Sequence, residues 1–228
     1  LCLIMATSSR ALASVVRRLA SPHSVNSVAR TARRFTPALG ARQFSIGLSS
    51  GNPFTPGFKP HTGTQVWPEV ELFKAMTWDE GVASDFKTSG YKEIFEGKKV
   101  VVFALPGAFT GVCHKAHVPS YSKNVDAFKA KGVDSIVCIA INDPYTMNSW
   151  KEKLGDAAKG IDFYGDVNRD FTKFMHMEKD LRAAGLGPGQ RSNRYSLCVE
   201  DGVITHIFEE EGPGDLAVSD GDTMLKAL

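Results

Sequence analysis

Short apolar runs alternate with amphipathic stretches along the second half of the chain. Three apolar runs predict buried strands: 99–104, 134–142 and 161–164. Four stretches predict helices: 112–130, 143–154, 168–175 and 219–228. Strand candidates at 195–200 and 203–208 flank Asp201-Gly202, a pair typical of a tight hairpin turn, and Ser219 is the expected cap of the last helix. The pattern predicts an α/β fold in which a mixed sheet carries helices on both faces.

The first 50 residues differ in composition from the rest. They carry seven Arg and no acid or Lys, and the first acidic residue of the chain is Glu69. Leu12, Val15, Val16 and Leu19 would form an apolar stripe on a helix whose other positions hold Arg. A segment that is rich in Arg and Ser, poor in acids and amphipathic as a helix is typical of a mitochondrial transit peptide.

Three parts of the chain are expected from these patterns. Arg42-Gln43-Phe44-Ser45 resembles a mitochondrial processing site, so residues 1–44 are predicted to be the transit peptide, with the cut at Ser45 or about eight residues later. Met5 is the expected start of translation. Residues 45–65 are rich in Pro and Gly and predict a linker or a loosely docked arm. Residues 66–228 then form the folded domain, which we expect in the mitochondrial matrix.

Two other interpretations of the N-terminal segment stay open, namely chloroplast import and a basic arm that binds nucleic acid or membrane. The chain has 27 basic and 25 acidic residues, and removing the seven N-terminal Arg leaves 20 against 25. A mildly acidic domain gives no reason to expect nucleic acid as a partner. No apolar run approaches the roughly 20 residues that a membrane span needs, so no membrane partner is expected either.

A hydroxyl and a thiol lie three residues apart where the first predicted strand gives way to a helix. Thr110 and Cys113 follow directly on the turn that Pro106-Gly107 opens. The first N–H groups of a helix have no partner inside it and stabilise a nearby anion, here a thiolate. Thr110 can accept the hydrogen bond of the thiol or donate one to a bound oxygen. The helix end stabilises a thiolate by only ~0.3–1 kcal/mol, which is too little to keep the thiol ionised at neutral pH, so a fixed positive charge is needed as well.

The stretch from Pro106 to Cys113, together with His117-Val118-Pro119-Ser120-Tyr121, resembles the active-site signature of the type II peroxiredoxins. The similarity covers roughly residues 66–228 and is greatest to the plant and algal mitochondrial form. Four further stretches carry it: 77–81, 97–101, 141–144 and 191–195. The resemblance implies a thioredoxin-like arrangement of the sheet and helices.

The resemblance also implies roles for four residues. Cys113 would attack the terminal oxygen of hydrogen peroxide or an alkyl hydroperoxide and become a sulfenic acid. Arg194 matches the position of the family's active-site arginine, although Arg191 is close enough in sequence to confuse the assignment. Arg194 and Thr110 would stabilise charge on the departing oxygen, and Pro106 would shield the thiolate from water.

The remaining cysteines leave the recycling step open. Cys2 precedes the expected start, and the chain has no Cys-x-x-Cys pair, which favours reactive thiol chemistry over a disulfide scaffold. Cys138 matches the second cysteine of plant type II enzymes, regarded there as the resolving residue. It lies in the middle of an apolar run, so a core thiol is the alternative, with glutaredoxin and glutathione or thioredoxin attacking Cys113 directly. Cys198 is predicted to be a core residue.

The leading prediction is a thiol-dependent peroxidase that uses no cofactor. A redox-sensing or chaperone-like switch protein that does not sustain turnover is the alternative. Cys113, His114 and His117 resemble a metal-binding motif, but no second ligand pair follows, so no metal is expected. His117 is instead predicted to form hydrogen bonds behind the pocket. The family implies a homodimer or a monomer in equilibrium with one.

Overall fold

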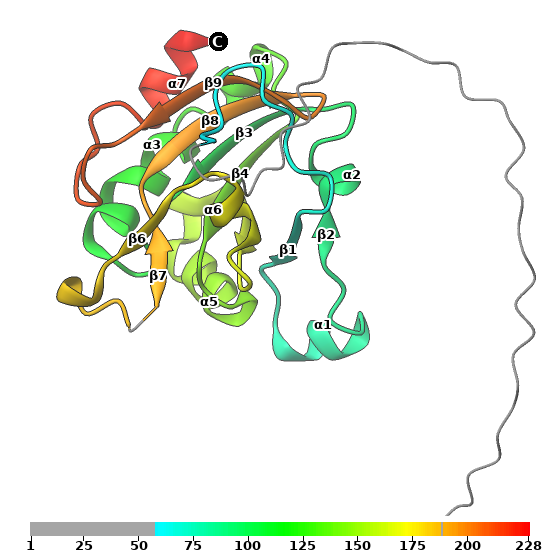
Figure 1. Ribbon diagram of the computed structural model, residues 1–228. Coiled ribbons are helices and arrows are strands. Elements are labelled where there is room, and N and C mark those ends of the chain that lie inside the picture. The colour runs from blue at the N-terminus through cyan, green and yellow to red at the C-terminus, as the bar shows by residue number, and fades with distance from the viewer. Residues whose placement is uncertain (1–57, 188) are drawn as a thin grey trace, which may run out of the picture. The chain divides into compact units, whose positions relative to one another are not determined.

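The computed structural model describes residues 58–187 and 189–228 (Figure 1). The predicted transit peptide, its helical stripe and the first part of the predicted arm lie outside these residues. No helix in the described ranges combines the length and the apolar character that crossing a membrane requires.

A mixed sheet of seven strands forms the centre of the described part of the chain, in the order β2-β1-β5-β4-β3-β8-β9. β3, β4 and β5 run parallel to one another, whereas β1, β8 and β9 each pair antiparallel with their neighbours. The strands are β1 (Glu71–Lys74), β2 (Ser89–Gly90), β3 (Lys99–Ala104), β4 (Ser135–Ala140), β5 (Asp162–Gly165), β8 (Tyr195–Glu200) and β9 (Val203–Glu209). A separate antiparallel pair joins β6 (Glu178–Asp180) to β7 (Gln190–Ser192).

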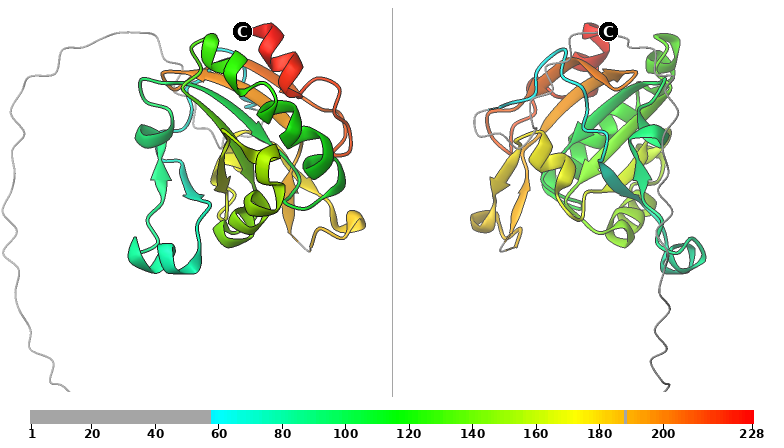
Figure 2. Two further views of the ribbon diagram at one scale, coloured as in Figure 1. Left: turned by 180° about the vertical axis from the view of Figure 1, so that it is seen from behind. Right: turned by 45° about the vertical axis from the view of Figure 1, so that its right-hand side comes forward.

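Helices cover both faces of this sheet, as the sequence predicted. They are α1 (Trp78–Ala83), α2 (Tyr91–Ile94), α3 (Val118–Ser122), α4 (Val125–Ala130), α5 (Pro144–Leu154), α6 (Asp170–Phe174) and α7 (Gly221–Ala227). A π-helical turn, Cys113–His117, precedes α3, and 3₁₀ turns occupy Gly155–Ala158 and Arg182–Ala184. Seen from behind, the green helices α3 to α5 and the red α7 lie across one side of the sheet (Figure 2).

Alternate residues of β3 build two separate cores because successive side chains of a strand point to opposite faces. Val100 and Val102 join the core that α2 and α6 cover. Val101 and Phe103 join the core that contains side chains from α3, α4, α5 and α7. Cys113 belongs to this second core, so the helix that carries it is held against the centre of the sheet.

The hairpin and the helix after β4 form where the sequence predicted them. Asp201 and Gly202 connect β8 to β9 with positive φ angles of 46° and 77°, as a tight hairpin turn requires. Asp143 caps α5 by accepting a hydrogen bond from the N–H of Thr146, and Pro144 takes the first helical position, where no N–H is needed.

The predicted continuous helix 112–130 is instead broken into segments. Pro119 has no N–H to donate, and the chain before it widens into the π-helical turn, in which the N–H of Val118 reaches the carbonyl of Cys113. The helix is interrupted again at Asn124, whose side chain donates a hydrogen bond to the carbonyl of Ser120. The first interruption of the helix therefore takes the form of a wide turn that begins at Cys113.

The predicted cap of the last helix was wrong by one residue. The side chain of Asp220, and not that of Ser219, accepts the hydrogen bonds from the first N–H groups of α7. The hydroxyl of Ser219 donates to the carboxylate of Glu210 instead. Ser219 therefore stabilises the loop before the helix and leaves the helix end to its neighbour.

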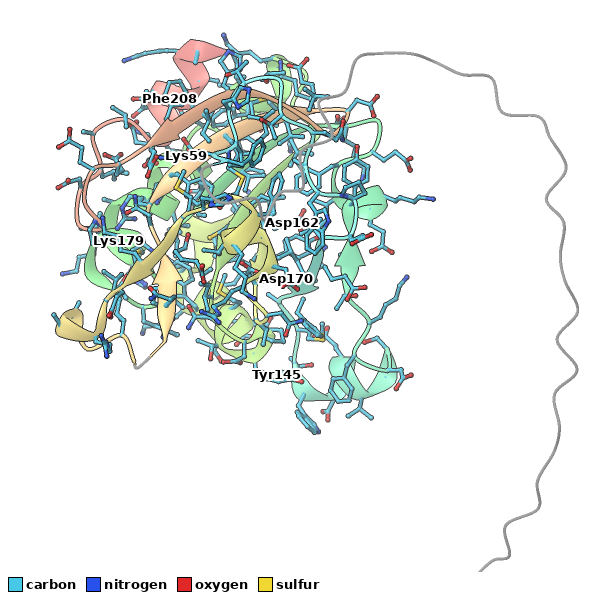
Figure 3. All side chains as sticks on the ribbon, in the orientation of Figure 1. Lys59, Tyr145, Asp162, Asp170, Lys179 and Phe208 are labelled. Carbon is cyan, nitrogen blue, oxygen red and sulfur yellow. The ribbon has the colours of Figure 1, made fainter. Side chains whose placement is uncertain are left out.

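The last residues of the predicted arm pack along β9. The N–H of Gly63 donates to Ile204, the N–H of Ile204 donates to Thr64, and Gln65 forms a bridge with Val203. Lys59, labelled in Figure 3 near the β8–β9 part of the sheet, forms an ion pair with Glu209. Residues 58–65 are thus docked on the edge of the sheet.

Candidate active site

Cys113 lies just after the start of a helical segment, 111–122, that follows β3 and a short loop. In this loop Phe109 has a positive φ of 62°, a left-handed conformation that is unusual for an aromatic residue. The side-chain oxygen of Asn142 accepts a hydrogen bond of 3.0 Å from the N–H of Ala108 and ties the loop to the end of β4. The thiol of Cys113 is buried, with 1% of the residue exposed.

Arg194 is the cation that the structure brings to this thiol. Its Nη1 lies 3.4 Å from the Sγ of Cys113, although 81 residues separate the two in sequence. The side chain is itself buried, and its Nε has no hydrogen-bond partner among the described residues. Arg191 does not approach Cys113 in this way, because its guanidinium donates to the carbonyls of Leu186 and Ile141. Of the two arginines, Arg194 is therefore the one that faces the thiol.

His117 is a second neighbour of Arg194 and acts as a neutral hydrogen-bond acceptor. Its Nδ1 lies 3.0 Å from Nη1 of Arg194, and its Nε2 lies 3.1 Å from the carbonyl of Ser219. A carbonyl can only accept, so Nε2 carries the proton and Nδ1 offers a lone pair to Arg194. Burial, followed by the positive charge of Arg194, lowers the pKa of His117 to about 3. The ring is therefore uncharged at neutral pH.

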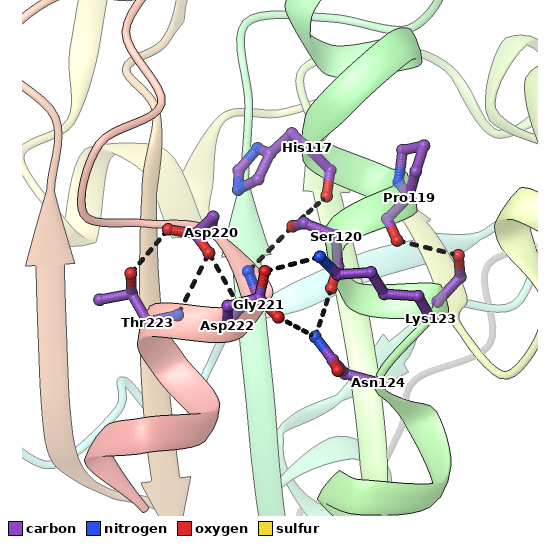
Figure 4. Close-up of polar contacts among 10 residues, drawn as sticks. His117, Pro119, Ser120, Lys123, Asn124, Asp220, Gly221, Asp222 and Thr223 are labelled. Atoms are coloured by element: carbon purple, nitrogen blue, oxygen red, sulfur yellow. Dashed lines mark hydrogen bonds and ion pairs between the residues drawn. The ribbon is translucent and has the colours of Figure 1, made fainter.

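The start of α7 is held against α3 close to this histidine (Figure 4). Ser120 donates its hydroxyl proton to the carbonyl of His117 and accepts the N–H of Gly221. Asp222 accepts hydrogen bonds from Lys123 and Asn124. These contacts fix the C-terminal helix and the loop before it to the helix that carries Cys113.

Thr110 and Pro106 lie in the loop between β3 and the helical segment that carries Cys113. The hydroxyl of Thr110 donates to the carbonyl of Gly107 at 2.9 Å and not to the thiol. With its proton used in this way, the oxygen keeps its lone pairs for an incoming hydrogen-bond donor. Pro106 is buried at the end of the strand. Both residues thus lie in the short loop that leads into the helical segment of Cys113.

Cys138 and Cys198 lie in the sheet and not at the helix. Cys138 is fully buried in β4, paired with Phe103 on one side and Phe163 on the other. Burial, and the charge of Cys113 after it, raise the pKa of Cys138 well above the usual value. Cys198 is buried in β8, where burial again raises the thiol pKa, in agreement with the predicted core position. All three described cysteines are free thiols.

The histidines of the apparent metal motif are engaged in other contacts. The Nδ1 of His114 accepts a hydrogen bond of 2.9 Å from the indole of Trp150, and both ring nitrogens of His117 have partners. No group of three or more metal-ligating side chains gathers anywhere in residues 58–187 and 189–228. His117 therefore forms hydrogen bonds beside the thiol, as the sequence predicted.

Two further residues at the site had not been predicted from the sequence. Pro213 accepts a hydrogen bond of 2.8 Å from Nη2 of Arg194 through its carbonyl, and the carboxylate of Glu210 accepts the N–H of Ser219, whose carbonyl orients His117. A backbone carbonyl leaves no signal in a sequence. Glu210 lies in a run of three glutamates, 209–211, of which it alone is buried.

Comparisons with known proteins agree with this site. The model of the Redoxin family matches residues 50–225. Mitochondrial peroxiredoxin-2F of Arabidopsis thaliana is 51% identical over 162 residues, which cover 71% of this chain and 79% of that protein. The protein of the same name from Oryza sativa subsp. japonica is 53% identical over 161 residues, or 71% and 80% of the two chains.

Among solved structures, reduced Prx3 of Vibrio vulnificus in complex with hydrogen peroxide is similar to this chain. Its TM-score is 0.63 and its identity 36%, over 74% of this chain and 99% of that one. The predicted thioredoxin-like fold, the type II resemblance and the mitochondrial location are confirmed by these findings. The chain therefore belongs to the peroxiredoxins, the thiol-dependent peroxidases of the Redoxin family.

Proposed function

We propose that Cys113 is the residue that reacts with peroxide. The observation that carries this proposal is the buried contact of 3.4 Å between its Sγ and Nη1 of Arg194. A guanidinium keeps its charge at any physiological pH, so it favours the thiolate, which is the nucleophilic form. In residues 58–187 and 189–228, no arginine forms a hydrogen bond with Cys138 or Cys198, and burial raises the pKa of each thiol.

The reaction then proceeds by displacement at oxygen. The thiolate of Cys113 attacks the terminal oxygen of the peroxide, so a sulfur–oxygen bond forms while the oxygen–oxygen bond breaks. The sulfur is oxidised by two electrons to a sulfenic acid, and the departing oxygen leaves as water or an alcohol after taking a proton. Arg194 stabilises the charge on that oxygen, with its Nε, which has no partner among the described residues, as a further donor. Thr110 accepts a hydrogen bond from the O–H group of the bound peroxide.

The sulfenic acid is reduced by a thiol that comes from outside the site. Glutaredoxin with glutathione, or thioredoxin, would supply it. Cys138 takes part only when the structure opens, because it lies in the middle of the sheet and a disulfide needs Cα atoms within about 7 Å with suitable orientation. The wide π-helical turn at Cys113 is the segment whose unwinding would allow such a disulfide.

The proposed parts of the chain are a transit peptide at residues 1–44, an arm at 45–65 and the enzyme domain at 66–228. Sequencing the N-terminus of the protein recovered from mitochondria tests the first boundary.

We also propose a homodimer, or a monomer in equilibrium with one, formed beside the active site. Such a dimer would cover the side chain of Phe109, which is 51% exposed in the loop that precedes the thiol. Sedimentation of the wild type and Phe109→Ser tests it.

Steady-state turnover tests the peroxidase assignment. Peroxide consumption is measured for the domain from residue 45 with each reductant in turn, comparing the wild type with Cys113→Ser, Cys138→Ser and Cys198→Ser. Loss of all turnover in Cys113→Ser alone supports the proposal. A wild type that reacts once and turns over with no donor would favour the alternative, a redox switch that uses the same cysteine.

A further inference from the structure

Two acceptors other than the thiol contact the guanidinium of Arg194, and the position of each depends on the loop between β9 and α7. Its Nη2 donates directly to the carbonyl of Pro213 at 2.8 Å. Its Nη1 faces Nδ1 of His117 at 3.0 Å, and that ring is oriented by the carbonyl of Ser219. The loop that spans residues 210–220 therefore decides where the guanidinium points.

The second half of this loop is folded around the carboxylate of Glu210, whereas Asp215 closes the turn that contains Pro213. The Oε1 of Glu210 accepts hydrogen bonds from the N–H groups of Ala217 at 2.9 Å, Val218 at 2.9 Å and Ser219 at 2.8 Å. The hydroxyl of Ser219 donates to the same oxygen at 2.8 Å. Glu210 is 3% exposed. Burial alone would raise the pKa of Glu210, but these hydrogen bonds outweigh it and the pKa is lowered, so the carboxylate stays charged.

The same bonds place the carbonyl of Ser219. That carbonyl accepts from Nε2 of His117 at 3.1 Å and from the hydroxyl of Tyr121 at 2.7 Å. Because it fixes the proton of His117 on Nε2, it leaves the lone pair of Nδ1 facing Arg194. The backbone N–H of Glu210 also donates to the carbonyl of Arg194 at 3.0 Å, which ties the two residues together.

We propose that Glu210 is a positioning residue for the peroxide reaction, which holds Arg194 against Cys113 through the carbonyl of Ser219 and the neutral ring of His117. Its carboxylate forms its hydrogen bonds with residues 217–219 and not with the thiol, so it acts through the loop that it folds. The inference rests on the proposed roles of Cys113 and Arg194.

Three variants of the full domain test it. Glu210→Ala removes the acceptor, Glu210→Gln keeps a neutral acceptor oxygen in the same place, and Glu211→Ala removes the exposed neighbouring glutamate as a matched control. The first measurement is the second-order rate constant for oxidation of Cys113 by hydrogen peroxide in a single turnover. The second is the pH profile for alkylation of Cys113 by iodoacetamide, which needs no peroxide.

Glu210→Ala is expected to slow oxidation by about 10- to 100-fold, since displacement of a reacting group by about 1 Å has effects of this size. Its alkylation profile should move to higher pH. Glu210→Gln should recover most of the rate, and Glu211→Ala should match the wild type. A folded Glu210→Ala with the rate of the wild type, or with a slower rate and an unchanged alkylation profile, overturns the proposal.

If circular dichroism shows that Glu210→Ala does not fold, His117→Phe decides the question. It keeps an aromatic ring, which packs 5.0 Å from the ring of Phe103, but has no acceptor for Arg194. The same slow oxidation and shifted profile are expected, and unchanged values overturn the proposal. Failure of the proposed function would look different, because peroxide consumption would then persist in Cys113→Ser.

Discussion

Gly221 is the residue at which the packing of the C-terminal helix can be tested most sharply. A Cβ atom added to it would lie 2.2 Å from the carbonyl oxygen of Ser120 and 3.0 Å from the Cα of Tyr121, both backbone atoms. Restoring an ordinary contact requires a displacement of about 1 Å of α7 against α3. The bond between the N–H of Gly221 and the hydroxyl of Ser120, now 2.9 Å, would be stretched by that movement.

The cost of Gly221→Ala follows from these contacts. Forcing an extra carbon into a packed interface costs ~1–3 kcal/mol, and a lost buried hydrogen bond costs ~1 kcal/mol more. We therefore expect the free energy of unfolding to fall by about 2–4 kcal/mol. At about 2–4 °C per kcal/mol for a domain of this size, the melting temperature should fall by about 4–16 °C.

Thermal unfolding followed by circular dichroism measures this effect. Gly214→Ala is the matched control, because an added Cβ there meets nothing within 4 Å, and its melting temperature should change by no more than ~2 °C. Helix propensity alone favours Ala over Gly at position 221 by up to ~1 kcal/mol. A Gly221→Ala protein that melts at or above the temperature of the wild type would therefore refute the reasoning.

Three further predictions concern the site. Arg194→Met should slow the single-turnover reaction of Cys113 with peroxide by ~10²-fold or more in stopped-flow measurements, while Arg182→Met, at an exposed ion pair, should leave it unchanged. Thr110→Val should slow the same reaction by about tenfold, and a rate equal to that of the wild type would remove the hydroxyl from the mechanism. His117 has a folded-state pKa of about 3, below the 6.5 of the unfolded chain, so stability should fall as pH drops through this window. The loss is ~2 kcal/mol between pH 7 and pH 5, and urea unfolding should show that His117→Gln lacks it; an equal loss in both proteins would contradict the assignment.

The central strands and the hairpin could be predicted because each is a local pattern. The apolar run 99–104 is β3, and Asp201-Gly202 is the turn that joins β8 to β9. The strands that were missed, β1, β2, β6 and β7, have two to four residues each and no clear alternation. Their pairing is decided by tertiary contacts, which a local pattern does not contain.

The same distinction between local patterns and tertiary contacts applies to the residues of the candidate site. Thr110, Cys113 and Pro106 share one short motif, and the sequence predicts them together. Arg194 could be named only with the help of the family resemblance, since 81 residues separate it from the thiol. The carbonyl of Pro213 and the carboxylate of Glu210 depend on how the loop closes, and only the structure reveals them.

Trapping the first oxidised cysteine tests the central claim most directly. The reduced domain is treated with one equivalent of hydrogen peroxide in the presence of dimedone, which labels sulfenic acids, and the peptides are analysed by mass spectrometry. The proposed mechanism predicts the adduct on Cys113, with Cys138 and Cys198 unlabelled. An adduct that forms first on Cys138 or Cys198, or undiminished labelling of the protein in Cys113→Ser, would contradict it.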